Sequence, residues 1–309
     1  GEKWILGPCR SSAHSWPILS GTMDFGMGHW TSFAQVLVSR LGVPIHAIRL
    51  AQGDSDRLNV GGGSGGSKSM QVAGEAIVQA SAVVIEKGRI LASHLFEAGV
   101  DDIAFANGVF RVAGTDRGIA ILDLAARLRA GTLRLPEDAP KTLDADAVID
   151  GVPMTFPNGC HVAEVEIDPE TGATRVARYT AVTDSGTVVN PMLLEGQVHG
   201  GVVQGIGQAL MEHTVFDEHG QLLTGSFMDY CLPRADTVPF IASESLPSPA
   251  RSNTLGIKGV GESGCAGALT SVMNAVVDAL SVYGIRHLDM PATPERVFAA
   301  IRAARDGRS

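Results

Sequence analysis

Apolar residues recur every three or four positions in several stretches of the chain, which is the spacing of one helix face. The longest of these stretches run from Met70 to Val84 and from Ala268 to Leu280, and each follows a glycine-rich segment. A shorter stretch from Phe33 to Leu41 ends before Gly42-Val43-Pro44, a sequence typical of a helix end. The pattern therefore predicts helices that begin directly after loops with little side-chain bulk.

Strands are predicted between these helices by β-branched and alternating residues. Asn107-Gly108 between two apolar runs is a strong hairpin signal, and so is Asp168–Gly172 between two further runs. The chain thus mixes helices with hairpins, which predicts an α+β fold. The expected strands are Ile45–Leu50, Ile103–Phe105, Val109–Val112, His161–Ile167 and Thr174–Val182. A third hairpin is expected at Val215–Leu223. Short helices are expected at Ile119–Leu128 and from Pro294 onwards.

The polar stretch from Pro136 to Gly151 is the best candidate for an internal boundary, because it is rich in Asp and contains Pro. With 309 residues, the chain is near the upper limit for a single hydrophobic core. We therefore expect two mixed α/β subdomains, residues 1–140 and residues 141–309. The stretch from Pro233 to Asn253 is expected to be a surface connection, since Pro and Ser are frequent in it.

A further helix is predicted from Asn190-Pro191, because Asn is a favoured helix cap and Pro a favoured first residue. Its sequence is unusual, since each of its many glycines destabilises a helix by about 1 kcal/mol relative to Ala. Either the backbone crosses another helix closely, or it contacts a polar ligand together with glutamines on one face, and both explanations remain open. The glycines are Gly196, Gly200, Gly201, Gly205 and Gly207, and the glutamines are Gln197, Gln204 and Gln208.

Composition and charge narrow the classes of function. Hydrophobic residues make up 45% of the chain and charged residues 18%, which indicates a globular protein. The net charge of −9 argues against a nucleic-acid binder, which needs a basic surface. We expect no membrane span, because no apolar run is expected to reach the roughly 18 residues that a bilayer requires. The first residues do not resemble a signal peptide, so a cytoplasmic location is expected.

The cysteines and histidines argue against a metal ion held by side chains. Cys9, Cys160, Cys231 and Cys265 lie far apart, and no C-x-x-C spacing occurs, which excludes the usual iron–sulfur and zinc motifs in this chain. The histidines include no H-x-x-x-H pair. We therefore expect reduced, buried thiols and no metal ligand among the side chains.

Ser67-Lys68-Ser69 follows a run of glycines and precedes a predicted helix. The glycine turn would bring two hydroxyls, one ammonium group and the N–H groups of a helix start to one place, which suits an anion or phosphate. The loop is not a Walker A motif, because Ser67 separates Gly66 from Lys68, and no dinucleotide fingerprint follows it. The alternative is a flexible linker followed by a helix cap.

Two further loops lead into predicted helices. Glu262 lies in the glycine-rich stretch Lys258–Gly264, before a helix for which Ser263 is a candidate cap. The positive end of a helix favours an ionised carboxylate, which is the form that a general base requires. The alternative is that Glu262 only complements the helix dipole. Phe25–Gly28 likewise precedes a helix start, where free N–H groups would point outward. The alternative is that this loop is an ordinary tight connection.

Taken in order, these segments closely resemble the molybdenum-binding large subunit of the xanthine oxidase family, the molybdenum hydroxylases. The similarity runs almost continuously from about Ser20 to Leu280 and corresponds only to the C-terminal part of such a subunit. It is carried by Gly26-Met27-Gly28-His29, Gly65-Gly66-Ser67-Lys68-Ser69, Asp184-Ser185-Gly186 with Asn190-Pro191, Glu195-Gly196-Gln197-Val198-His199-Gly200-Gly201, Gln204-Gly205-Ile206-Gly207 and Gly259-Val260-Gly261-Glu262.

The resemblance implies the fold of the cofactor-binding domain in such large subunits, and it implies roles for particular residues. Glu262 would be the base that deprotonates the hydroxide on the metal before it attacks an electrophilic carbon. The metal would be held by the sulfurs of the cofactor, so no side chain is implied as a ligand. The phosphate of molybdopterin, in its cytosine dinucleotide form, would be held by Gly66, Ser67, Lys68 and Ser69. The pterin and dithiolene would lie along Phe25, Gly26, Met27 and Gly28. Gln197 would hydrogen-bond near the molybdenum, and Gly261 would complete the contacts with the cofactor.

The implied reaction is hydroxylation of an aldehyde or an N-heterocyclic carbon with water. Met27 departs from the family, which usually has Gln there, and a thioether is only a weak acceptor. The alternatives are a hydratase of the same family, a non-catalytic scaffold subunit and, more distantly, a P-loop nucleotide binder. Because the reaction exports two electrons, we expect three partner chains: one that supplies the N-terminal half of the subunit, an iron–sulfur subunit and an FAD subunit.

Overall fold

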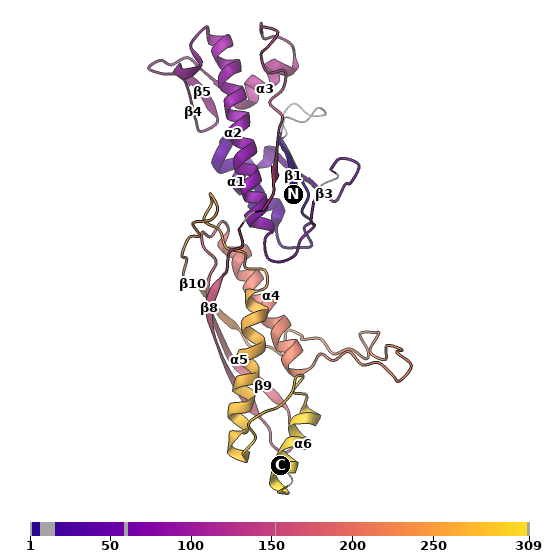
Figure 1. Ribbon diagram of the computed structural model, residues 1–309. Coiled ribbons are helices and arrows are strands. Elements are labelled where there is room, and N and C mark those ends of the chain that lie inside the picture. Colours follow the sequence, from indigo (N-terminus) through magenta and orange to yellow (C-terminus); the bar gives the residue numbers. More distant parts are fainter. Residues whose placement is uncertain (1, 7–15, 59–60, 152, 308–309) are drawn as a thin grey trace. The chain divides into compact units, whose positions relative to one another are not determined.

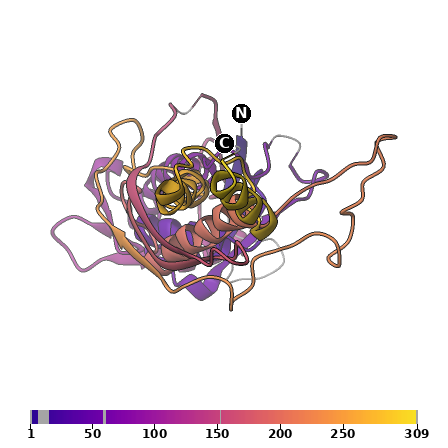
Figure 2. The same ribbon diagram turned by 90° about the horizontal axis from the view of Figure 1, so that it is seen from below.

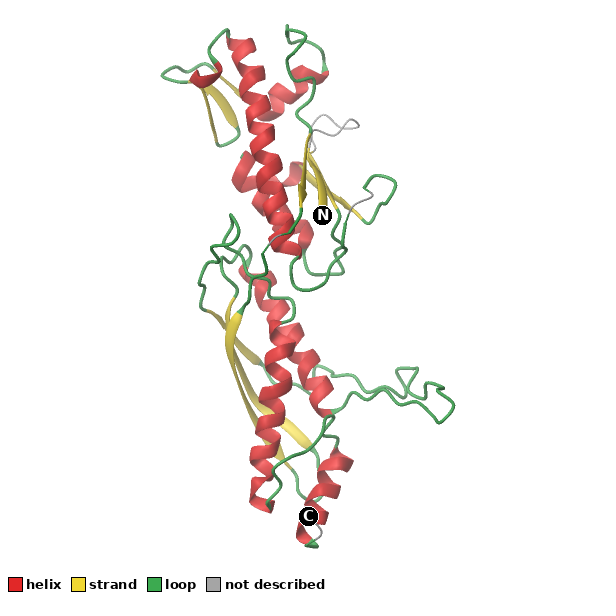
Figure 3. Cartoon of the chain, viewed as in Figure 1, coloured by secondary structure: helices red, strands yellow, loops and turns green. Residues whose placement is uncertain are grey.

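Figure 1 shows the computed structural model of the chain, which describes residues 2–6, 16–58, 61–151 and 153–307. The chain forms two compact units, and each contains both helices and strands (Figure 3). Unit 1 comprises Gly1–Thr155 with Pro249–Gly259, and unit 2 comprises Phe156–Ser248 with Val260–Ser309. Cys9 lies outside the described residues. Cys160 and Cys231 are exposed and Cys265 is half-buried, so the expectation of buried thiols is wrong for these three.

Unit 1 is built on a four-stranded sheet and two helices: β1 (Glu2–Leu6), β2 (Trp16–Ser20), β3 (Ile48–Gln52), β7 (Ala145–Ile149), α1 (His29–Leu41) and α2 (Ser69–Phe96). The strand order is β3-β2-β1-β7, and only β2 and β3 run parallel. A parallel pair needs a crossover, which α1 provides. The predicted strand from Ile45 begins only at β3, because a short 3₁₀ turn, η1 (Ile45–Ala47), precedes it.

The core of unit 1 confirms the apolar faces predicted for α1 and α2. Phe33 and Leu37 of α1 and Ile77 of α2 are fully buried. Trp16 and Ile18 of β2 are buried as well, and α2 packs against both α1 and the sheet. The helical spacing of apolar residues therefore reflects one continuous core.

A small antiparallel sheet lies beside α2: β4 (Ile103–Ala106), β5 (Val109–Val112) and β6 (Gly118–Ala120), with η2 (Val100–Asp102) before it and α3 (Ile121–Arg129) after it. Asn107 and Gly108 have φ angles of 49° and 79°, so they form the two-residue hairpin turn that their sequence predicts. Phe110 packs over Gly88 of α2, where an added Cβ would lie 2.1 Å from the ring. Glycine is therefore required at that position of the helix.

Unit 2 consists of a three-stranded sheet and helices: β8 (Asn158–Ile167), β9 (Thr174–Asp184), β10 (Ile241–Ser245), α4 (Pro191–Leu210), α5 (Ser263–Leu280), η3 (Ser281–Tyr283) and α6 (Pro294–Arg305). The predicted β8–β9 hairpin is present, and β10 pairs in parallel with β9. The strands pass along one side of α4 and α5 (Figure 2). Tyr179, Val202, Val272 and Ile301 are among the buried residues that join sheet and helices in one core.

The helices α4 and α5 cross so closely that only glycine fits at the contact. A Cβ added to Gly205 would lie 2.5 Å from the Cβ of Ala268, and one added to Gly201 would lie 2.9 Å from the backbone nitrogen of Cys265. The crossing therefore explains part of the unusual glycine content of α4. Gly196 and Gly200 differ, because a Cβ on either would have no atom within 4 Å.

The expectation that no stretch is long and apolar enough to cross a membrane is wrong. Ser263–Tyr283 has the required length and a mean hydropathy of 1.5. In the structure, however, Ala268, Val272 and Val276 are fully buried within unit 2. One face of α5 thus packs in the core of unit 2 against α4 and the sheet, although only 22% of its apolar window is buried.

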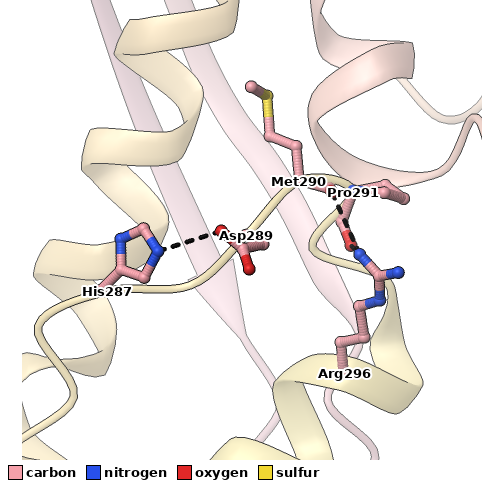
Figure 4. A network of polar contacts seen from close by, with 5 residues as sticks. All are labelled: His287, Asp289, Met290, Pro291 and Arg296. Carbon is pink, nitrogen blue, oxygen red and sulfur yellow. Dashed lines mark hydrogen bonds and ion pairs between the residues drawn. The ribbon is translucent and has the colours of Figure 1, made fainter.

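The segment before α6 is held by its own side chains (Figure 4). Arg296 donates from Nη1 to the carbonyl oxygens of Met290 and Pro291, at 3.1 and 3.3 Å. His287 Nε2 lies 3.0 Å from Asp289 Oδ1 in the same segment. These contacts fix the chain that leads into α6. The helix predicted from Pro294 is present as α6.

The division into units differs from the expected boundary after residue 140. The chain first leaves unit 1 after Thr155, and Pro249–Gly259 later returns to it. Thr254 fixes this return, because its N–H and its hydroxyl donate to the two carboxylate oxygens of Glu75, at 3.1 and 3.0 Å. The stretch Pro233–Asn253, expected to be only a connection, also contains β10.

Candidate functional site

Asp24 organises the loop Phe25–Gly28 at the start of α1. Its Oδ1 accepts the N–H groups of Gly26 and Gly28 at 2.8 and 3.3 Å, and its Oδ2 accepts that of His29 at 2.8 Å. Burial alone raises the pKa of the Asp24 carboxyl, but the bond from Gly26, the neighbouring His29 and the other backbone bonds outweigh it and lower the pKa. The N–H groups expected to point outward are therefore bound by Asp24 at these three residues.

Phe25 and Met27 are the large side chains of this loop. Phe25 is 69% exposed, and its N–H donates to the Met27 sulfur at 3.2 Å. Gly26 and Gly28 have φ angles of 113° and 81°, which glycine adopts without strain. The thioether that replaces the usual Gln is therefore part of the turn, and the aromatic ring is displayed at its surface.

The glycine-rich loop before α2, residues 61–68, is the second glycine loop, and it lines a cavity of about 610 Å³ within unit 1. Of the predicted residues, Gly66, Ser67 and Lys68 face this cavity, whereas Ser69 is the first residue of α2. No side-chain hydrogen bond caps α2, so the helix cap named in the alternative explanation is absent. The cavity is lined by Gly61, Gly62, Gly65, Gly66, Ser67, Lys68, Gln71, Val72, Ile149, Asp150, Gly151, Met154 and Thr155.

The two glycine loops are joined by a short chain of hydrogen bonds. Ser69 Oγ donates to Ser64 Oγ at 3.1 Å, and Ser64 Oγ donates to the carbonyl oxygen of Met23. The N–H of Gly63 also donates to the carbonyl oxygen of Gly21, at 3.1 Å. The start of α2 and the residues before Asp24 are thus parts of one local structure.

Gly259 closes the loop from another side. A Cβ on Gly259 would lie 1.5 Å from the carbonyl oxygen of Ser67, so no other residue fits there. Ser67 itself has a φ of 55°, a conformation that non-glycine residues rarely adopt. The N–H of Gly259 donates to Thr155 Oγ1 at 3.3 Å, and that hydroxyl donates to Gln71 Oε1 at 3.0 Å. The unusual backbone of Ser67 is therefore enclosed by a polar network of three chain segments.

Part of the cavity wall lies outside the glycine loop and was not predicted from the sequence. Gln71, Met154 and Thr155 line the cavity, as do Asp150 and Gly151 directly after β7. The only signal in the sequence is the Asp-Gly pair after a strand, which was assigned to the polar boundary stretch. Gln71 is buried, and its Nε2 donates to the carbonyl oxygen of Pro153 at 2.6 Å.

A second cavity of about 480 Å³ shares the wall Ile149–Gly151 with the first. Glu75, Arg251 and Thr254 supply its charged and polar lining. Burial alone raises the pKa of Glu75, but the bonds from Thr254, then the bond from Gln79 and the charge of Arg40, outweigh it and lower the pKa. A carboxylate at this position is therefore held ionised beside the returning segment.

Glu262 is itself the N-cap residue of α5, and Ser263 is the first residue of the helix. The predicted cap is thus displaced by one residue, because the Ser263 hydroxyl donates to the carbonyl oxygen of Val260 at 2.9 Å. Glu262 and Gly261 are exposed within unit 2. Burial raises the pKa of the Cys265 thiol, and the charges of Glu212 and Glu262 raise it further. The carboxylate of Glu262 therefore contributes negative charge at the start of α5.

The glutamines of α4 do not form a buried polar stripe. Gln204 and Gln208 are exposed and Gln197 is half-buried, beside the buried Val198. The close helix crossing is present, but these glutamines are not buried in it. Gln197 lies between Gly196 and Gly200, where an added Cβ would have no atom within 4 Å.

The predicted site residues divide between the two units. Unit 1 contains the loop Phe25–Gly28 and residues 66–69, and unit 2 contains Gln197, Gly261 and Glu262. Among the described residues, no group of three or more His, Cys, Asp or Glu side chains is placed to hold a metal ion. The polar groups that gather around the larger cavity belong to unit 1.

Comparison with known proteins relates this arrangement to a family. Residues 15–239 match the model of the molybdopterin cofactor-binding domain. The chain is 36% identical over 283 residues to the carbon monoxide dehydrogenase large chain of Hydrogenophaga pseudoflava. It is also 36% identical over 296 residues to the nicotine 6-hydroxylase large subunit of Paenarthrobacter nicotinovorans. These matches cover 91% and 96% of this chain but only 35% and 36% of the relatives, so the chain spans about a third of their length.

The fold agrees with a solved structure of the same kind. Quinoline 2-oxidoreductase from Pseudomonas putida 86 superimposes with a TM-score of 0.86 at 34% sequence identity. The superposition covers 97% of this chain and 38% of that one. The predicted α+β fold, with the architecture of a molybdenum-cofactor-binding domain, is therefore confirmed.

Proposed function

The chain belongs to the molybdopterin cofactor-binding domain family, and from this premise we propose that it forms the cofactor-binding and base-bearing part of a molybdenum hydroxylase. The reaction would replace C–H by C–OH with oxygen from water, releasing two electrons and two protons. We propose an aldehyde or an N-heterocyclic carbon as substrate. The name of nicotine 6-hydroxylase, a relative, supports the heterocycle.

The observation that carries this proposal is the cavity beside the start of α2. Its glycine wall lets a ligand approach the backbone, Ser67 and Lys68 supply polar groups, and the uncapped helix start favours an anion. A volume of about 610 Å³ lies within the usual range for cofactor sites. These features fit the phosphate end of molybdopterin.

The remaining residues fit the same extended cofactor. We propose that the exposed ring of Phe25 packs along the pterin and that Gly26 and Gly28 allow its close approach. Lys68 would hold a phosphate, and the adjoining second cavity, with Arg251 and Asn253, offers room for the cytosine dinucleotide form. When bound, the cofactor supplies a molybdenum centre that activates water and takes up the two electrons.

Glu262 is the general base in this proposal. As the N-cap residue of α5 it stands at the positive end of a helix, which favours the ionised carboxylate that can take a proton. Its carboxylate oxygens would accept the proton that water loses as it adds to the substrate carbon. Gln197, on the half-buried face of α4 between two unobstructed glycines, would donate or accept a hydrogen bond beside the reacting groups.

We also propose that the chain works within a larger assembly. The relatives named above are a large chain and a large subunit, of which this chain spans about a third. The rest of the subunit, an iron–sulfur subunit and an FAD subunit would complete the substrate pocket and carry the electrons away.

Metal analysis of the purified complex, together with release of pterin by acid, tests the proposal. Molybdenum and pterin are expected in the wild-type complex. Both should fall in Ser67→Ala/Lys68→Ala/Ser69→Ala, because charge-assisted hydrogen bonds contribute about 1.5–3 kcal/mol each. Lys141→Ala, an exposed lysine outside the cavity, is the matched control and should retain both.

Absence of molybdenum and pterin from the wild-type complex would overturn the proposal. Full occupancy in the triple variant would show that the loop is only a helix start. Substrate turnover without any electron acceptor would instead identify a hydratase.

A further inference from the structure

An acidic arm, residues 213–232, leaves unit 2 after α4 and returns before β10. It begins with a hairpin, in which Phe216 bridges to Leu222 and Asp217 N–H donates to the carbonyl oxygen of Gln221 at 2.9 Å. Figures 1 and 2 both show this part of the chain projecting away from the helices of unit 2. The arm therefore has a defined backbone without being packed on the unit that carries it.

The apolar side chains of the acidic arm are exposed. Phe227 and Met228 at its tip are 87% and 93% exposed, and Phe216 and Leu223 are more than half exposed. The core of unit 2 includes Met211 before the arm and Val238 after it, but no residue of the arm itself. Four large apolar side chains on one short projection are more than scattered surface residues, and such surfaces mark interaction sites.

The acidic arm is anchored at its base. Tyr230 donates from its hydroxyl to Glu212 Oε2 at 2.6 Å, which ties the returning strand of the arm to the residue that precedes it. Ser226 Oγ donates to Asp229 Oδ2 at 2.6 Å and closes the turn at the tip. A projection held in shape by its own polar contacts loses little conformational freedom on binding, which favours a stable complex.

The charge of the acidic arm restricts its partner. Asp217, Glu218 and Asp229 are its charged groups besides two histidines, and it contains no Lys or Arg. A complementary surface would be apolar at the centre with basic residues around it. A second copy of this chain, with a net charge of −9 and the same arm, meets that description poorly.

The comparisons restrict the partner further. The acidic arm lies within the part of the chain that matches the family, residues 15–239. About two thirds of each relative lies outside the part that this chain matches. We propose that the acidic arm docks into an apolar pocket with a basic rim on the polypeptide that corresponds to this unmatched part, whether on the same chain or a separate one. The inference rests on the proposed assembly but on neither the cofactor nor Glu262.

Site-specific photocrosslinking in the purified complex tests the docking. Phe227→p-benzoylphenylalanine is expected to crosslink, on irradiation, to peptides of the unmatched part, identified by mass spectrometry. Val282, which is 81% exposed on η3 and lies outside the arm, is the matched control position and should give no such product. Crosslinks to a second copy of the arm, to an iron–sulfur or FAD subunit, or to nothing would each overturn the inference.

A pair of substitutions gives an independent measurement. Phe227→Ser/Met228→Ser removes apolar surface that touches no core residue of unit 2, so the circular dichroism spectrum should not change. In the purified complex, amide exchange at residues 213–232 should accelerate about tenfold or more, because the apolar anchors of the docked arm are lost. Unchanged exchange would contradict the docking. Molybdenum content, measured on the same preparations, shows separately whether the proposed function holds.

Discussion

At the scale of single residues, Asp24 shows how one carboxylate can fix a functional loop. It accepts three backbone N–H groups around the turn Phe25–Gly28, and Phe25 in turn donates to Met27. Two of the three residues that donate to Asp24 are Gly26 and Gly28, at positive φ. The side chains proposed to face the pterin are thereby held by a residue that would not touch the cofactor.

Asp24→Asn should lower the free energy of unfolding at neutral pH by about 1 kcal/mol, the usual effect of losing a helix-start carboxylate. The folded-state pKa of Asp24 is lowered, so its contribution is present above the unfolded pKa of about 3.9 and disappears as pH falls through the folded pKa. The difference between wild type and variant should therefore shrink below about pH 4. Chemical denaturation of wild type and variant between pH 3 and pH 7 measures this difference.

The exposed Asp138 provides the matched control for this measurement. Asp138→Asn should change stability little at any of these pH values. A wild-type-to-variant difference for Asp24 that stays constant across the pH range would contradict the assigned role of its charge.

Glu262→Gln separates a base from a helix-dipole partner. If Glu262 takes the proton, the variant should keep its molybdenum and lose about 10²–10⁴-fold in turnover, because Gln cannot accept a proton. If it only complements the dipole, the variant should lose about 0.3–1 kcal/mol of stability and keep its rate. Glu295, also in the first turn of a helix, is the matched control, and Glu295→Gln should leave turnover unchanged.

Thr155 offers a test of the network around Ser67. Thr155→Val has nearly the same shape but removes the hydroxyl that Gly259 and Gln71 bind, whereas Thr155→Ser retains it. Amide exchange at residues 256–259 should accelerate about tenfold in the Val variant, since one hydrogen bond contributes roughly 0.5–1.5 kcal/mol. Molybdenum content should fall with it, and Ser should restore both. Equal exchange in the two variants would remove Thr155 from the network.

At the scale of elements, α4 combines two kinds of glycine. Gly201 and Gly205 lie in the crossing with α5, where added atoms would collide with that helix. Gly196 and Gly200 face open space on either side of Gln197, so the crossing does not account for them. The bare backbone at these two positions fits the proposed approach of a ligand.

Alanine substitutions should distinguish these glycines. Gly205→Ala should destabilise unit 2, because its Cβ would lie 2.5 Å from that of Ala268. Gly196→Ala and Gly200→Ala should instead stabilise the protein by up to about 1 kcal/mol each. If a ligand approaches there, the same two variants should contain less molybdenum despite their higher stability. Thermal unfolding and metal analysis of the same preparations measure both effects.

The elements also show what the sequence can and cannot predict. The hairpin at Asn107-Gly108 and the apolar faces of α1, α2 and α5 were predictable, because they depend on residues close in the chain. The cavity wall at Asp150, Gly151, Met154 and Thr155 was not, since it depends on contacts between distant segments. The cap of α5 was misplaced by one residue, because both Glu262 and Ser263 are chemically suited to a helix start.

At the scale of the whole molecule, unit 1 is discontinuous. The returning segment Pro249–Gly259 supplies Thr254 to Glu75 and Gly259 to the loop at Ser67. A boundary assigned from composition alone could not reveal this return, because its cause is packing against α2. Residues 1–155 therefore lack the lining of the second cavity that Arg251–Thr254 provide, and they lack Gly259, which packs against Ser67.

A fragment of residues 1–155 should consequently be less ordered around Ser67 than the complete chain. Hydrogen exchange at residues 67–72 should be faster in the fragment, and fusing residues 249–259 through a flexible linker should slow it again. A scrambled version of the same eleven residues is the control and should have no effect. Equal exchange in the fragment and the complete chain would contradict the structural role of the return.

The discontinuity of unit 1 has a consequence for synthesis on the ribosome. Gly259 emerges roughly 100 residues after Thr155, and at about 5–20 residues per second this corresponds to roughly 5–20 s of translation. During that time the nascent chain has Ser67 but neither Gly259, which packs against it, nor the residues 251–254 that line the second cavity. Cofactor insertion that depends on the finished cavity must therefore wait until most of unit 2 has been translated.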